Sequence, residues 1–219
     1  MKYFILAIIC CCSMNVKSQT HIEWKDSLRV LNEKIRVYPS STDLRLKKAA
    51  VNIELDQWEY AIEEYSKVLE LDEKNLAALY YRAYAYTHLK NYDLAKVNYE
   101  RFLSIMPKNF EAQLGLAMVK RKMGRKTDAM DEFNKLVQMF PDSTLSYVAR
   151  AGYETELEQY DVALFDWDEA IRRDPKNADL VASKVDVLLK QKKYDDARKE
   201  LSTARKRGVI LAPIRSEDE

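Results

Sequence analysis

The sequence has few of the residues that make turns. It holds four glycines and five prolines among 219 residues, whereas a fold of many short strands needs turn residues at frequent intervals. At 47% hydrophobic residues it is also too apolar for an intrinsically disordered chain. The scarcity of turn residues therefore favours an all-α fold.

No excess of one charge marks the chain. Lysine and arginine number 36 and aspartate and glutamate 35, a formal net charge of +1, so we expect no nucleic-acid partner. One basic run surrounds a possible turn, at Lys120, Arg121, Lys122, Arg125 and Lys126. Because no aromatic residue interleaves this run, we interpret it as a solvated turn, with an acidic partner or anionic lipid as the alternative.

An apolar segment near the start contains every cysteine. Lys2 precedes ten apolar residues, which run from Tyr3 to Cys12, and polar residues follow up to Ser18. This order of charge, apolar core and polar tail is typical of a secretory signal peptide, and ten apolar residues are too few for a bilayer, which needs about 20. We expect cleavage after Ser18 or Gln19 and export to the periplasm or the medium.

Removal of the signal peptide at residues 1–19 would take away Cys10, Cys11 and Cys12. The exported chain would then have no disulfide, no thiol nucleophile and no thiolate metal site. One alternative is an uncleaved core segment. Another is a lipoprotein signal, in which one of these three cysteines becomes an acylated first residue. Membrane association is expected only in that case.

Residue patterns that carry catalysis are scarce. The two histidines, His21 and His88, have no metal-ligand spacing around them, and four glycines leave no phosphate-binding loop. Acidic pairs such as Glu63-Glu64 and Asp195-Asp196 are expected on solvated helix faces rather than as general acid and base. We therefore expect no cofactor, no metal and no enzymatic activity.

Alanine recurs with a period of 34 residues. The five alanines of this ladder are Ala61, Ala95, Ala129, Ala163 and Ala197. A bulky residue follows each of them by four positions, at Tyr65, Tyr99, Phe133, Trp167 and Leu201. Eight positions further on stands a proline in the three middle units, at Pro107, Pro141 and Pro175. A fixed period of this length is typical of a repeat protein.

These residues resemble the tetratricopeptide repeat family, whose pattern places a small residue, an aromatic, Ala-x-x-x-aromatic and proline over 34 residues and two helices. The resemblance covers five units, at residues 42–75, 76–109, 110–143, 144–177 and 178–211. It implies a right-handed α-solenoid of helix-turn-helix repeats. We expect an amino-terminal cap helix within residues 20–41, over Ile22 to Tyr38, and a short tail at residues 212–219.

Helical spacing predicts how one unit packs. In the second unit the first helix is expected over Ala77 to Leu89 and the second over Asp93 to Ile105, with apolar residues recurring at three and four. The ladder alanine lets two helices approach closely, and Tyr99 is expected to fill the groove against the next unit. Leucine at Ala129 should therefore overpack the repeat, while leucine at Ala112, expected on the outer part of a first helix, should be tolerated.

The resemblance also implies a binding surface, because first helices of this family line the inner groove. The expected groove residues are Leu46, Ala50, Ile53, Tyr80, Tyr84, Thr87, His88, Leu114, Met118, Arg121, Gly152 and Thr155. Tyr80, Tyr84 and His88 form one stripe at i, i+4 and i+8, which suits an extended or helical peptide. The alternative is that these tyrosines only complete packing between repeats. The lysines and asparagine that hold a terminal carboxylate in chaperone-binding members have no counterpart here.

The sequence thus predicts a non-catalytic scaffold that binds a protein or peptide segment in its groove, in the cell envelope or outside the cell. The alternative is a structural component of an envelope assembly that stacks through its end faces, with or without a lipid anchor.

Overall fold

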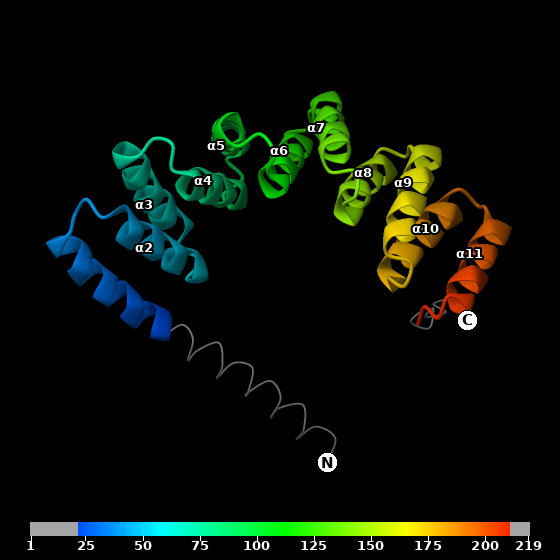
Figure 1. Cartoon of the computed structure of the whole chain (residues 1–219), viewed down its shortest axis with the longest axis horizontal. Helices are drawn as coiled ribbons and strands as arrows, with labels where there is room; N and C mark the ends of the chain where they lie inside the picture. Colours follow the sequence, from blue (N-terminus) through cyan, green and yellow to red (C-terminus); the bar gives the residue numbers. More distant parts are fainter. Residues whose placement is uncertain (1–21, 211–219) are drawn as a thin grey trace, which may run out of the picture. The chain divides into compact units, whose positions relative to one another are not determined.

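The computed structural model describes residues 22–210, and all regular structure in that range is helical. A first helix over residues 22–37 precedes ten others. These are α2 (Thr42–Glu54), α3 (Trp58–Leu71), α4 (Leu76–His88), α5 (Tyr92–Ile105), α6 (Phe110–Lys122), α7 (Lys126–Met139), α8 (Thr144–Glu156), α9 (Tyr160–Arg173), α10 (Ala178–Lys190) and α11 (Tyr194–Lys206) (Figure 1). The all-α prediction is confirmed. The expected signal peptide and the expected tail lie outside the described residues.

Capping residues explain where the first helices begin. The side chains of Ser41, Asn75 and Asn109, each 34 residues apart, accept hydrogen bonds from backbone N–H groups three residues later, at 3.3, 3.0 and 2.8 Å. A polar side chain in this place satisfies a donor that the helix leaves unpaired. The observed α4 and α5 lie within one residue of the helices predicted for the second unit.

The second helices end where the prolines predict. The last helical residues of α5, α7 and α9 come two positions before Pro107, Pro141 and Pro175. Proline lacks the N–H that would continue the helix, and it biases the preceding residue toward an extended conformation. The prolines therefore separate one repeat from the next.

The turn inside each repeat contains one left-handed residue. Positive φ angles occur at Asp56, Lys90, Gly124, Glu158 and Lys192, which are spaced by 34 residues. Only the third repeat has a glycine there, with φ of +73°. The other four turns have a non-glycine residue in this left-handed conformation, which a Cβ atom disfavours. The turn therefore keeps its backbone geometry even where glycine, the residue that best tolerates it, is absent.

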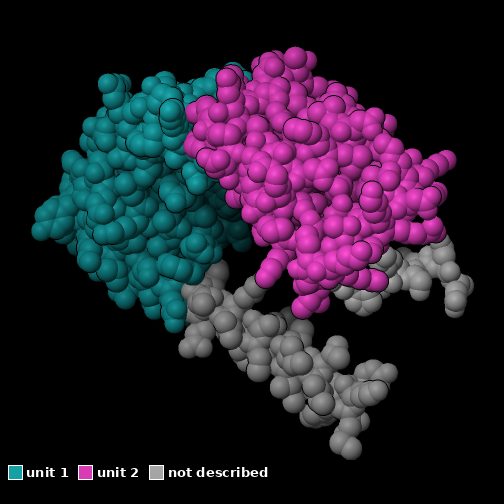
Figure 2. Space-filling view, turned by 45° about the vertical axis from the view of Figure 1, so that its right-hand side comes forward, with its two compact units in different colours: residues 1–123 teal, residues 124–219 magenta. Residues whose placement is uncertain are grey.

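The chain divides into two compact units, residues 22–123 and 124–210 as described (Figure 2). The division falls inside the third repeat, so that α6 belongs to the first unit and α7 to the second. In the first unit Ala61 and Ala95 are fully buried, and in the second Ala163 is fully buried and Ala197 nearly so. Alanine is thus the residue that lets paired helices approach closely.

The bulky residue after a ladder alanine fills a space against the following helix where one exists. A Cβ atom added to Gly115 of α6 would come within 2.5 to 2.9 Å of the ring and hydroxyl of Tyr99, which α5 supplies. This contact confirms that Tyr99 packs against the next repeat. The expectation for Ala112 is wrong, however, because its side chain is fully buried in the same core. Leucine at Ala112 would therefore overpack the core of the first compact unit as well.

Within residues 22–210 no helix is both long enough and apolar enough to cross a membrane.

Candidate functional site

The first helices of three successive repeats lie side by side in the first unit. Helix α4 contacts α2 on one side and α6 on the other, while α3 and α5 pack behind it. The face formed by α2, α4 and α6, called here the first-helix face, carries most of the predicted groove residues. Its exposed side chains determine what it can bind.

An aromatic cluster lies on this face. The Trp58 ring, at the start of α3, stacks on His88 with 4.0 Å between ring centroids and 7° between planes. Tyr84 meets both rings edge on, at 5.9 Å from Trp58 and 4.6 Å from His88. Tyr84 is 38% exposed, and His88 is also exposed. Three rings that hold one another in place form a rigid apolar surface next to solvent.

Tyr80 has a different role from Tyr84, although both lie on one stripe of α4. Its ring is half-buried and meets Tyr99 at 5.8 Å and Phe102 at 6.0 Å, both edge on. Burial raises the pKa of the Tyr80 hydroxyl, and the charge of Glu111 raises it further. The stripe therefore divides: Tyr80 belongs to packing between repeats, and Tyr84 with His88 belongs to the surface.

The predicted residues of α2 and α6 divide in a similar way. Leu46 and Ile53 are half-buried against the core of the first unit, and Ala50 is exposed. Leu114, Met118 and Arg121 are half-buried on α6, where the Arg121 guanidinium lies 3.7 Å from the Met118 sulfur.

Three further predicted residues contribute little to the face. The Thr87 hydroxyl is half-buried and donates to the carbonyl of Ala83 at 2.8 Å, within its own helix. Gly152 and Thr155 lie on α8, which belongs to the second compact unit. Gly152 is exposed, and the Thr155 hydroxyl donates to Ala151 within the helix. The structure thus brings together the groove residues of the first unit and does not add those of α8.

Sequence reasoning missed a ladder of buried polar residues. One residue before each bulky residue stands Glu64, Asn98, Glu132, Asp166 or Glu200, and the first four are at most 4% exposed. The expectation that Glu64 faces solvent is therefore wrong. Arg45 donates to its carboxylate at 2.8 Å and Lys48 at 2.9 Å, which compensates for burial of the charge. The same 34-residue period that revealed the alanines would have revealed this ladder.

A basic side chain on the first helix pairs with this polar residue in most repeats. Arg150 binds the fully buried Asp166 through two nitrogens, at 2.6 and 2.8 Å, and also donates to Asn134 of the preceding repeat at 3.0 Å. Lys184 likewise joins Glu200 and Asp168, each at 2.6 Å. These cations connect neighbouring repeats, so the buried charges are explained by architecture and not by catalysis.

Two buried carboxyls respond to their surroundings in opposite directions. Burial raises the pKa of Glu154 to about 7, with the nearby Asp166 adding to the effect of burial and Arg150 opposing it. Burial also disfavours ionisation of Glu64, but the hydrogen bonds from Lys48 and Arg45 outweigh burial and lower its pKa. Both groups face partners of the repeat framework, and among residues 22–210 no three His, Cys, Asp or Glu side chains form a group that could hold a metal ion.

Comparisons with known proteins agree with this architecture. The tetratricopeptide repeat profile matches residues 46–101 and, in a second version, residues 155–209, while the profile of the Fis1 C-terminal tetratricopeptide repeat matches residues 77–127. A DnaJ homolog subfamily C member 7 homolog from Dictyostelium discoideum is 24% identical over 180 residues, covering 75% of this chain and 33% of that protein. The chain spans a third or less of the length of the first curated relatives that it matches.

Solved structures give the same fold. A tetratricopeptide repeat protein from Parabacteroides merdae superposes with a TM-score of 0.64 at 21% identity, covering 88% of this chain and 76% of that one. YrrB, described as a TPR protein with an unusual peptide-binding site, superposes with a TM-score of 0.61 at 20% identity, covering 80% and 90%. The tetratricopeptide repeat profiles together match residues 46–127 and 155–209, more than half of the chain, and with the 34-residue ladder and the helix pairs they place the chain in the tetratricopeptide repeat family.

Proposed function

We propose that this protein is a non-catalytic scaffold that binds a segment of a protein partner on its first-helix face. The observation that carries the proposal is the aromatic cluster of Trp58, Tyr84 and His88, in which Trp58 is half-buried and the other two rings are exposed. Tetratricopeptide repeat proteins mediate protein–protein interaction, and the peptide-binding site named for YrrB supports a peptide as the bound element.

The physical chemistry of the cluster suits a peptide side chain. Rings that are already stacked lose little conformational freedom on binding, so most of the apolar area that they bury contributes to affinity. Ala50 of α2 is also exposed, and Arg121 brings positive charge to α6. An apolar segment flanked by acidic residues therefore fits the face best.

Single substitutions separate binding from packing. We expect Tyr84→Ser to weaken partner binding about tenfold or more with a small change in stability, because the ring is an exposed anchor. Tyr80→Ser should instead lower stability by about 1 to 3 kcal/mol, since it removes a ring packed on Tyr99 and Phe102. Tyr60→Ser is the matched control, because Tyr60 is 61% exposed on the second helix α3.

The measurement is selection of a displayed peptide library on residues 20–219, followed by dissociation constants of the selected peptides for each variant. Peptides that bind the Tyr60 variant like the original protein and lose affinity for the Tyr84 variant would support the proposal. Peptides that bind all variants equally would place the binding surface elsewhere and refute it.

We further propose that the protein is exported in soluble form after removal of residues 1–18 or 1–19. The basis is the signal-like order of Lys2, the apolar core and the polar residues before Ser18. Intact mass of the protein from its native host should lack this segment. A mass that corresponds to an acylated cysteine at Cys10, Cys11 or Cys12 would replace soluble export by a lipid anchor.

A further inference from the structure

The second helices α3, α5, α7 and α9 present their bulky residue to the first helix of the next repeat. Tyr65, Tyr99, Phe133 and Trp167 are between 0 and 6% exposed as a result. Leu201 of α11 stands 34 residues after Trp167 and is only half-buried. The face of α11 around Leu201 is therefore equivalent to a surface that a helix covers in each earlier repeat.

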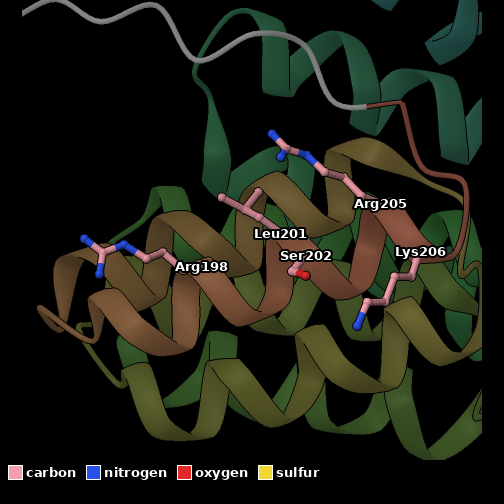
Figure 3. A pocket seen from close by; sticks show the side chains of 5 residues that line it. All are labelled: Arg198, Leu201, Ser202, Arg205 and Lys206. Atoms are coloured by element: carbon pink, nitrogen blue, oxygen red, sulfur yellow. The ribbon is translucent and has the colours of Figure 1, made fainter.

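This α11 face is basic. Arg198, Leu201, Ser202, Arg205 and Lys206 line an open pocket of about 530 Å³ (Figure 3). Arg198 has an ion pair with Asp195 at 3.1 Å, and both of these side chains are largely exposed. Three cations and one apolar side chain in one pocket favour an acidic occupant with an apolar residue of its own. A second copy packed α11 against α11 would bring like charges together.

The residues that follow α11 in the sequence have this composition, apolar residues together with acidic ones. Val209 is buried in the core of the second unit, where its N–H donates to the carbonyl of Ala204 at 3.0 Å. Ile210 is 90% exposed and begins the segment 210–214, Ile-Leu-Ala-Pro-Ile. Arginine, serine and three acidic residues follow at positions 215–219. The segment thus places apolar residues first and negative charge last.

The repeat period gives residues of this segment equivalent positions in the earlier repeats. Ile214 follows the buried Leu180 by 34 residues, and Ala112 and Ser146 occupy the same position in earlier repeats, where both are fully buried. Asp218 follows Lys184 by 34 residues, and Lys184 reaches across to Asp168 of the preceding second helix.

Position 218 carries an acid and the α11 face is basic, whereas in the fifth repeat Lys184 is basic and its partner Asp168 is acidic. Relative to the fifth repeat, both charges are therefore reversed.

We propose that residues 211–219 bind the α11 face, with Ile214 against Leu201 and the three acidic residues beside Arg198, Arg205 and Lys206. Nine residues reach about 30 Å when extended, and the thirteen residues of α11 span about 20 Å, so the segment is long enough. The proposal does not rest on the first-helix face as a binding site. It implies that a partner helix or a second copy reaches this end only by displacing the segment.

Disulfide formation between introduced cysteines tests the proposal. In a chain with Cys10, Cys11 and Cys12 changed to serine, Ser202→Cys and Asp218→Cys should form an intramolecular disulfide at least tenfold faster than the control pair, Asp186→Cys with Asp218→Cys. Asp186 lies on α10, and its side chain is 59% exposed. Adding Arg198→Glu and Arg205→Glu should slow the first pair several-fold, since these changes remove the attraction between the segment and the face.

Three outcomes would overturn the proposal. Equal rates for the two pairs would mean that the segment has no preferred place on α11. A disulfide that forms between chains and rises with protein concentration would assign the face to a second copy. A rate for the first pair that the two arginine changes leave unaltered would remove charge as the basis of docking.

Discussion

Two helix-interior glycines should respond in opposite directions to the same change. Alanine is about 0.5 to 1 kcal/mol more favourable than glycine inside a helix, because glycine loses more backbone freedom on folding. Gly152 of α8 is exposed, and an added Cβ atom would meet no atom within 4 Å. We therefore expect Gly152→Ala to stabilise the protein by the full amount.

Gly115 also lies inside a helix, α6, but there is no space for a Cβ atom at this position. A Cβ atom there would lie 2.5 Å from Cζ and 2.8 Å from Cε1 of Tyr99. The Tyr99 ring is 3% exposed and packs edge on against Tyr80, so it cannot move aside freely. Overpacking of this kind costs about 1 to 3 kcal/mol, which exceeds the helix gain. Gly115→Ala should therefore destabilise the first unit by about 0.5 to 2 kcal/mol.

Urea unfolding followed by circular dichroism measures both changes. The free energies of unfolding of the two variants should differ by about 1 to 3 kcal/mol. A second variant locates the cause: in a Tyr99→Leu background, which leaves space over α6, the penalty of Gly115→Ala should largely disappear, and the double-mutant cycle should give a coupling above about 0.5 kcal/mol. If Gly115→Ala stabilised the protein as Gly152→Ala does, the close approach of the two helices would be refuted.

Three other predictions concern single side chains. Gly124→Ala should cost about 1 kcal/mol in unfolding free energy, because φ is +73° there although a Cβ atom would meet open space; an unchanged urea midpoint would contradict this. Because the pKa of Glu154 is raised in the folded protein, its protonation stabilises the fold fully below about pH 4.5, and this stability is lost as pH rises through about 7. The unfolding free energy should therefore fall by about 1 to 3 kcal/mol from pH 5 to pH 8. Glu154→Gln should remove this fall. Arg150→Met should cost about 3 to 5 kcal/mol by leaving Asp166 buried and unpaired. Arg172→Met should change the unfolding free energy by less than about 0.5 kcal/mol, because Arg172 is largely exposed and Glu169 keeps Arg173 as a partner.

The sequence by itself determined the repeat, its period and the position of each helix to within about one residue where a helix was predicted. These features follow from local chemistry. Caps such as Asn75, prolines such as Pro107 and the alanine ladder act within one turn of a helix, so their effect does not depend on distant residues.

The tertiary structure decided which side chains are covered. A helix in the middle of the array, such as α4, contacts α2, α3, α5 and α6. Its covered arc is therefore wider than the single apolar stripe that helical spacing predicts for a helix packed on one side. For this reason Ala112 is buried where exposure was expected, and Tyr80 and Tyr84 have different roles on one stripe.

The tertiary structure also decided which charged side chains are buried. Glu63 and Glu64 are adjacent in sequence, yet Glu63 is exposed while Glu64 is 2% exposed and paired. Lys67 of the same helix lies 3.5 Å from the Glu64 carboxylate, but its shorter partners, Arg45 and Lys48, come from α2, 19 and 16 residues earlier in the chain. Local sequence predicts the helix on which a carboxylate lies, whereas the packing of α2 on α3 brings these two cations, which make its burial favourable.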